Sequence, residues 1–168
     1  MITDFSKSHA SIISRLMKFG GLPALLAQPA AARMLASESV QFFRDAVFGH
    51  HADEERDLFP TILARTTQGE ELELVRSTVL RLTLEHRQIE AKWAKLEPVL
   101  LQVANGDAFD LDPAEIESLV LDYAAHAAFE EAEFLPLCRT ILARTRDHVS
   151  MTDLAHKGSW AATVPVAL

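Results

Sequence analysis

The sequence predicts an all-α fold, an up-down-up-down bundle of four helices. Two observations support this prediction: apolar residues recur in alternating steps of three and four, and no stretch alternates as a half-buried strand would. The 168 residues suit a single domain. We expect that domain at residues 1–147 and a weakly patterned C-terminal tail at 148–168.

Start and stop signals place the elements along the chain. The four helices are expected at residues 4–19, 32–65, 70–104 and 112–147. The first stops at Gly20-Gly21, and a connector containing two prolines follows. Pro60 predicts a kink inside the second helix. Gly106 is a typical helix C-terminal signal, and Asp112 can cap the last helix.

Composition narrows the function classes. A net charge of −8 argues against a nucleic-acid or anionic-membrane surface. The single cysteine, Cys138, excludes an intrachain disulfide and suits a reducing compartment. No apolar run approaches the roughly 20 residues of a membrane span, and the N-terminus has no signal-peptide core. We expect a cytoplasmic protein that binds neither nucleic acid nor membrane, and we leave a homodimer open.

The chemistry lies in an internal repeat with an offset of 76 residues. Each copy reads His-x-x-x-Glu-Glu and ends at a proline, as HHADEERDLFP at 50–60 and HAAFEEAEFLP at 126–136. Two earlier histidines, His9 and His86, precede these copies by 41 and 40 residues. The chain therefore contains two helix pairs with one plan: a histidine, then His-x-x-x-Glu.

These residues fall on the apolar seams and at matched heights, which predicts a two-metal site. His50 and His86 each lie 16 residues from the turn between their helices, roughly 24 Å along the axis. An unpaired carboxylate in such a core costs several kcal/mol, roughly, and two would repel each other, whereas cations remove that cost. Imidazole with carboxylate suits iron, with zinc, manganese or copper as alternatives. The candidate ligands are His9, His50, Glu54, His86, His126 and Glu130, with Glu90 as an additional candidate.

Neighbouring residues leave alternatives open. His51 has the same spacing to Glu55 as His50 has to Glu54, but Ala127 occupies the equivalent position in the second copy. We therefore expect His51 to contact a ligand or to be exposed. Glu55 and Glu131 are repeated but lie just off the seam, where they could hydrogen-bond a ligand histidine or be solvated.

The blocks SHASII, HHADEERDLFP, EHRQIE and HAAFEEAEFLP resemble the hemerythrin-like (HHE) cation-binding domain family over about residues 5–145. This resemblance implies a non-haem di-iron centre inside a four-helix bundle. By resemblance, His9 and His50 would bind one iron, and His86 and His126 the other. The glutamates of the two repeats would bridge the irons together with an oxo or hydroxo group.

The sequence departs from the oxygen-carrying hemerythrins in two places. Those proteins have a histidine where Glu90 stands, and a His-x-x-x-x-Asp motif on the last helix. The resemblance therefore favours binding or sensing of O2, NO or peroxide over oxygen storage. A di-iron oxidoreductase or an iron-donating repair protein is one alternative, and an interaction module with structural zinc is another. The sequence does not decide whether the protein is an enzyme, and it contains no recognisable catalytic motif.

Overall fold

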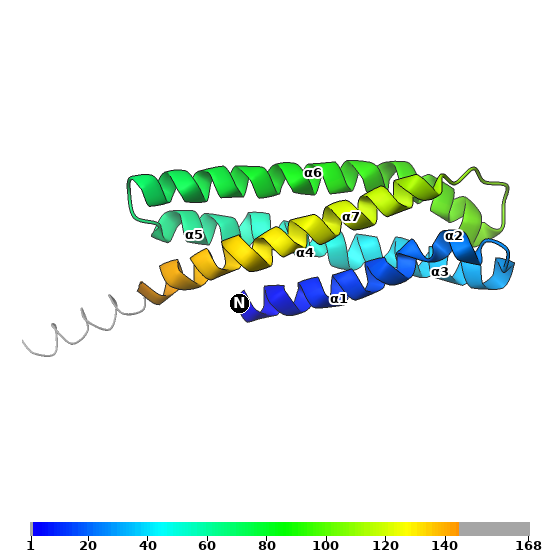
Figure 1. The fold of residues 1–168 in the computed structure, drawn as a ribbon, viewed down its shortest axis with the longest axis horizontal. Helices are drawn as coiled ribbons and strands as arrows, with labels where there is room; N and C mark the ends of the chain where they lie inside the picture. The colour runs from blue at the N-terminus through cyan, green and yellow to red at the C-terminus, as the bar shows by residue number, and fades with distance from the viewer. Residues whose placement is uncertain (1, 145–168) are drawn as a thin grey trace, which may run out of the picture.

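The computed structural model describes residues 2–144, and every regular element in that range is helical, which confirms the all-α prediction (Figure 1). The elements are α1 (Ile2–Gly20), α2 (Leu22–Leu25), α3 (Pro29–Phe42), η1 (Phe43–Val47), α4 (Phe48–Asp53), η2 (Glu54–Leu58), α5 (Phe59–Arg65), α6 (Glu70–Asn105), α7 (Pro113–Phe129) and η3 (Glu130–Phe134). The helix then continues through residues 135–144. The expected tail at 148–168 lies outside the described residues.

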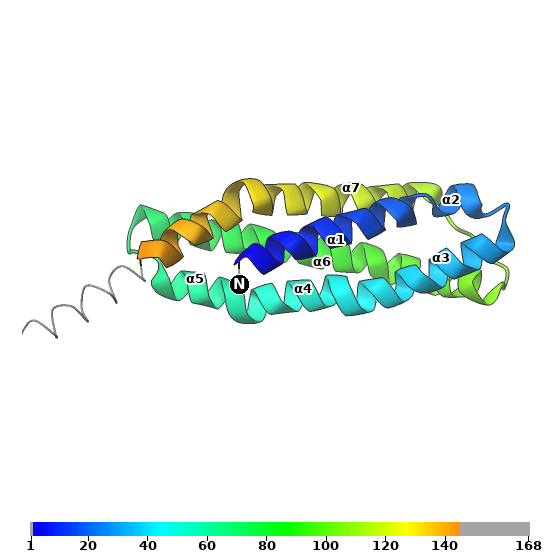
Figure 2. The same ribbon diagram turned by 90° about the horizontal axis from the view of Figure 1, so that it is seen from below.

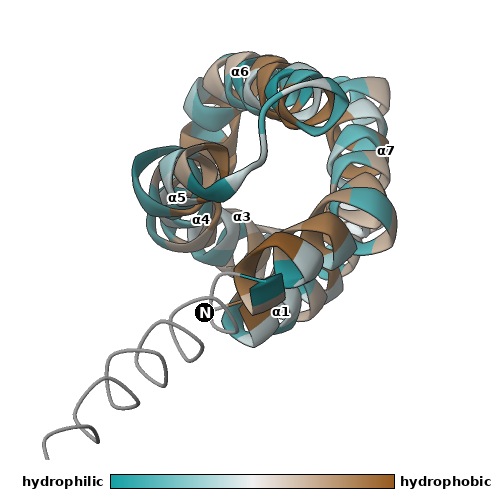
Figure 3. Ribbon diagram, turned by 90° about the vertical axis from the view of Figure 1, so that its left-hand side faces the viewer, coloured by the Kyte–Doolittle hydropathy of each residue, from teal (hydrophilic) through white to brown (hydrophobic). Residues whose placement is uncertain are grey.

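These elements form four columns around one core. The columns are α1, the continuous run from α3 to α5, α6, and α7 with its extension. Viewed along the bundle, each column turns its hydrophobic side inward (Figure 3). α6 packs against α3 and α7, and α1 packs against α7 and α3. α1 begins partway along the bundle, so its first turns lie near the middle of the molecule (Figure 1, Figure 2).

Local chemistry explains most helix ends. Gly106 has φ of +79° and ends α6 in the left-handed conformation that glycine adopts without strain. Asp112 caps α7, because its Oδ1 accepts a hydrogen bond from the Ala114 N–H at 2.9 Å. Two boundaries differ from the prediction. α3 starts at Pro29, which suits a first helical turn, and α2 occupies part of the expected connector.

The long second column contains two π-helical segments, η1 and η2, which no sequence pattern indicated. A π turn adds about one residue to a turn and changes which side chains face the core. Pro60 lies two residues after η2, and its equivalent Pro136 lies two residues after η3. The wider turn accommodates a proline that lacks the N–H an α-helix would need there.

The apolar core forms two clusters with a polar layer between them. One cluster is centred on Trp93, which stacks on Phe43 at 3.8 Å between ring centroids. The other gathers around Leu58, Leu82 and Phe134 toward the α5 end. Within the described range, no helix is long and apolar enough to cross a membrane.

Candidate metal centre

The polar layer holds all six side chains that the repeat predicts. α1, α4, α6 and α7 each contribute one histidine, and η2 and η3 each begin at a glutamate. The exposed fraction of each residue is 6% or less: His9, His50, Glu54, His86, His126 and Glu130. Four columns thus direct imidazoles and carboxylates into a single buried volume.

The six side chains fall into two overlapping groups. In each group, one ligand atom per residue lies within 4.8 Å of the others. His9 and His50 belong to the first group, His86 and His126 to the second, and both glutamates belong to each. The shared carboxylates lie between the two pairs of histidines, in the position that bridging ligands need.

Distances within the layer follow the repeat. His9 Nε2 lies 2.8 Å from Glu130 Oε2, and its equivalent, His86 Nε2, lies 3.4 Å from Glu54 Oε2. His50 Nε2 lies 3.6 Å from Glu54 Oε1, and His126 Nε2 lies 3.5 Å from Glu130 Oε2. Each glutamate is therefore close to the histidine one turn before it and to a histidine of another column.

A second set of carboxylates holds the opposite ring nitrogens. Glu131 Oε1 lies 2.8 Å from His9 Nδ1, and Glu55 Oε1 lies 2.8 Å from His86 Nδ1. Because a carboxylate only accepts, each Nδ1–H donates, and the Nε2 atom of each ring faces the centre. At His9 this Nε2 also lies 2.8 Å from Glu130 Oε2 and from His50 Nε2. Of the two alternatives left open by the sequence, hydrogen bonding to a predicted ligand is therefore the one observed for both glutamates.

His126 has a similar partner that sequence analysis missed. Its Nδ1 lies 3.0 Å from Glu85 Oε2. The position that Glu85 holds before His86 is held by Ser8 before His9, so the repeat gave no signal for this contact. A pairwise comparison of the two halves would have marked the position as different, but not as functional.

Burial makes this layer costly without a cation. Burial raises the pKa of Glu54 well above its usual range, and the nearby Glu130 carboxylate adds to the increase. Burial lowers the pKa of His50 and of His86 to about 3, and neighbouring histidines add to the decrease. For His9, burial opposes the charge, but two facing carboxylates outweigh it and raise the pKa.

Several buried polar atoms in this layer lack a hydrogen-bond partner among the described residues. They include the Nε2 atoms of His86 and His126, both carboxylate oxygens of Glu54, and Oε1 of Glu130, whereas Glu130 Oε2 lies 2.8 Å from His9 Nε2. Buried polar atoms are normally hydrogen-bonded, so such a cluster indicates a missing ligand. Neutral imidazoles and carboxylates are the donors that divalent and trivalent transition metals take. The residues present therefore fit metal binding.

Two of the three π turns occupy equivalent positions in the two copies of the repeat. η2 and η3 are equivalent, and each begins at a predicted glutamate ligand. η1 lies one turn before His50, whereas the equivalent part of the second half is regular α-helix within α7. The first half therefore contains a register change that the second half lacks.

His51 lies inside this layer, so the alternative that it is exposed was wrong. Only 1% of His51 is exposed, and its ring stacks on that of His86 at 3.9 Å between centroids. His51 follows His50 directly in α4, and both side chains are buried, as His126 and Ala127 are at the equivalent positions of the second half. A sequence pattern that follows a single apolar seam marks only one residue of such a pair.

Glu90, the additional candidate, lies at the edge and joins no candidate metal group among the described residues. Its Oε1 lies 3.3 Å from His51 Nδ1, and its Oε2 accepts a hydrogen bond from Arg87 Nη1 at 2.6 Å. Glu90 thus contacts a histidine of the polar layer and is itself partly exposed.

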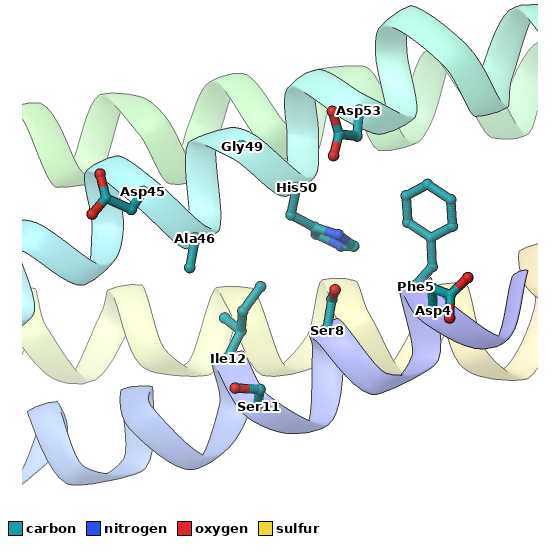
Figure 4. Close-up of a pocket in the computed structure, with 10 residues that line it drawn as sticks. All are labelled: Asp4, Phe5, Ser8, Ser11, Ile12, Asp45, Ala46, Gly49, His50 and Asp53. Atoms are coloured by element: carbon teal, nitrogen blue, oxygen red, sulfur yellow. The ribbon is translucent and has the colours of Figure 1, made fainter. Parts of the chain in front are cut away.

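A surface pocket of about 420 Å³ reaches the polar layer at His50. It lies between α1 and the η1–α4 segment, and the His50 ring extends into the space between them (Figure 4). Small residues such as Ser8 and Gly49 line it, together with the carboxylates of Asp4, Asp45 and Asp53. The pocket gives a small molecule a path to the first group of histidines.

The equivalent pocket at His126 is smaller, at about 170 Å³. Arg81 occupies the position equivalent to Asp4, and its Nε donates to Glu85 Oε1 at 2.7 Å. The Arg81 guanidinium also covers the Phe129 ring at 3.5 Å from its centroid. Larger side chains narrow the second pocket at five equivalent positions, where Arg81, Glu85, Gln88, Asp122 and Ala125 stand for Asp4, Ser8, Ser11, Ala46 and Gly49.

Comparison with known proteins agrees with this architecture. A family model described as the hemerythrin HHE cation binding domain matches residues 2–138. An uncharacterised protein of Haemophilus influenzae is 27% identical over 95 residues, which are 56% of this chain and 52% of that protein. The chain thus spans about half the length of this curated relative. No solved structure matches the chain. Because the family model covers most of the sequence, the chain belongs to the hemerythrin HHE cation-binding domain family.

Proposed function

We propose that the protein binds two metal ions, foremost iron, and uses them to bind or sense O2, NO or peroxide. The observation that carries the proposal is the pair of buried carboxylates of Glu54 and Glu130, three of whose four oxygens have no hydrogen-bond partner in the described part of the chain. They face imidazole nitrogens in the buried core. Two cations are the simplest ligands that compensate both carboxylates at once.

Each residue has a role in this proposal. His9 and His50 would hold one metal and His86 and His126 the other, with Glu54 and Glu130 shared between them. Iron at this centre would supply redox chemistry and coordination positions for a small ligand. Glu131, Glu55 and Glu85 keep the proton of their histidine on Nδ1, so that the Nε2 lone pair is available for the metal.

The pocket at His50 favours the proposal that the ligand is small and neutral. It is the wider of the two equivalent pockets, and it reaches a predicted ligand of the first metal. Three carboxylates line it, one of which, Asp53, is paired with Arg56 at 2.6 Å. Negative charge at the pocket disfavours anions but does not oppose O2, NO or hydrogen peroxide.

Spectroscopy on the iron-loaded protein tests this function. The protein is loaded with iron, reduced without oxygen, and exposed to O2 or to NO while the visible spectrum is recorded. We expect new absorption bands within the mixing time for at least one of the ligands. Two bound irons with an unchanged spectrum for both ligands and for peroxide would overturn the proposal.

The same sample separates the alternative functions. Continuous consumption of peroxide, O2 or NO with an electron donor would identify an oxidoreductase. Transfer of the bound iron to an apo-protein acceptor would identify an iron donor. Isolation with one tightly bound zinc and no response to any ligand would identify a structural cation site.

A further inference from the structure

His51 is a polar residue in the core whose inner nitrogen has no role in the six-residue centre. Its Nε2 is buried and has no hydrogen-bond partner among the described residues. One ring nitrogen from each of His51, His86 and His126 lies within 4.8 Å of the others. Nitrogen atoms of three imidazoles thus lie close together beside the second group. The His51 and His86 rings are nearly parallel, at 5°, so the His51 ring has to turn for both Nε2 atoms to bind one ion.

The Nδ1 atom of His51 contacts a carboxylate, as the Nδ1 atoms of His9, His86 and His126 do. Its Nδ1 donates to Glu90 Oε1 at 3.3 Å, which leaves the Nε2 lone pair for the interior. Glu90 is fixed by Arg87, and Arg87 also donates to Glu55, the partner of His86 Nδ1. One hydrogen-bond network therefore orients His51 and His86 together, as the carboxylate partners of metal-bound histidines do.

Packing alone does not require a histidine at this position. The second half has Ala127 there, equally buried and within regular helix. The first half has a histidine at this equally buried position, with the η1 turn lying one helical turn before it. A buried imidazole with one nitrogen unsatisfied needs a ligand on that nitrogen.

We infer that His51 is a seventh metal ligand, which binds through Nε2 the same metal as His86 and His126. This inference rests on the proposed two-metal function. It makes the centre unequal: one metal has three imidazoles, and the metal beside the wider pocket has two. The more open coordination sphere is then the one that the pocket reaches.

Cobalt(II) is a suitable probe, because its ligand histidines give strongly shifted, exchangeable imidazole N–H resonances in proton NMR. The metal-free protein and its variants are titrated with cobalt(II), and both the binding isotherm and the NMR spectrum are recorded. His51→Ala makes the position equal to that of the second half. His51→Phe keeps the volume and stacking of the ring without a nitrogen. Circular dichroism checks that both variants fold.

Phe59→Leu is the matched control. Phe59 is buried and also stacks against His86, at 5.9 Å between centroids, and leucine is the residue at the equivalent position 135. This variant removes a ring contact with His86 but no candidate ligand atom.

We expect the wild type and Phe59→Leu to bind two cobalt ions with the same number of shifted N–H resonances. Both His51 variants should lose one resonance and bind one of the two ions at least about tenfold more weakly. Full retention of resonances and affinity in the His51 variants would overturn the inference while leaving the two-metal proposal intact. Fewer than two ions in the wild type would overturn both.

Discussion

The two halves of the bundle share the residues that metal binding needs and differ in the residues around them. Both halves have one histidine on the leading helix, one His-x-x-x-Glu segment, a π turn that begins at the glutamate, and a further glutamate bonded to Nδ1 of the other half's leading histidine. The differences are η1, the buried His51, and the wide pocket at His50. The shared residues are those that the proposed pair of metals would require, and the differences would give each of the two metals different surroundings.

The largest expected effect comes from the residues that both metals share. Glu54→Gln and Glu130→Gln should each weaken both metals by more than the roughly 10–100-fold that loss of an outer partner costs. The reason is that each carboxylate belongs to both candidate groups. His9→Ala should weaken one metal only. Isothermal titration with the same metal measures all three, and full affinity for one metal in Glu130→Gln would contradict the bridging role.

The outer glutamates should have smaller and equal effects. Glu55→Gln and Glu131→Gln remove equivalent hydrogen bonds of 2.8 Å, one at each leading histidine. Each variant should lower the affinity of one metal by about 10–100-fold. Glu133→Gln, at an exposed position in the same π turn, is the control and should change nothing. A large effect of Glu131→Gln without one of Glu55→Gln would break the equivalence of the halves.

The prediction for the pocket at His50 concerns the rate of ligand binding, and the metal content should stay unchanged. The double variant Asp4→Arg/Ser8→Glu transfers the narrowing pair of the second half, Arg81 and Glu85, to the first half. Stopped-flow mixing of the reduced iron protein with NO should show binding slowed by at least roughly tenfold. Arg81→Ala opens the smaller pocket instead and should not slow it. An unchanged rate in the double variant would show that ligands reach the metals by another route.

The smallest effect is a pH dependence of the metal-free protein. Because the pKa of Glu54 is raised on folding, the folded state holds a proton that the unfolded state releases as pH rises above 4.5. Glu54 therefore costs up to about 1.4 kcal/mol of unfolding free energy per pH unit, until its folded pKa is reached. Subtracting the stability curve of Glu54→Gln separates the contribution of Glu54 from those of His50 and His86, whose lowered pKa values act in the opposite direction between about 3 and 6.5.

Urea unfolding from pH 5 to pH 8 measures this difference. We expect Glu54→Gln to gain on the wild type as pH rises, and Glu55→Gln, at a partly exposed position, to show a much weaker trend. A wild-type advantage that grows with pH would contradict the assigned direction.

The fold and the six central residues could be predicted because both depend on period and repetition. The apolar steps indicated four helices, and the His-x-x-x-Glu segments identified the seam that carries the polar residues. Glu55 and Glu131 could be named but not oriented, since a position just off the seam can face either solvent or a neighbouring column. That choice depends on the distance between columns, which no single-sequence pattern contains.

His51 and the pocket could not be predicted, for a different physical reason. His51 lies next to the seam that the apolar residues mark, so it was expected beside the centre or at the surface. No sequence pattern indicated the η1 turn. The pocket arises from small residues, such as Ser8 and Gly49, on two columns that lie together only in the folded chain. Small side chains at such positions produce no periodic pattern in the sequence.

Metal stoichiometry tests the central claim most directly. The metal-free protein is titrated with ferrous iron under anaerobic conditions, desalted, and measured for iron and protein by elemental and amino-acid analysis. The proposed two-metal centre predicts two irons per chain in the wild type and a loss of both in Glu54→Gln. A wild type that retains one iron or none, or a Glu54→Gln variant that retains two, would contradict it.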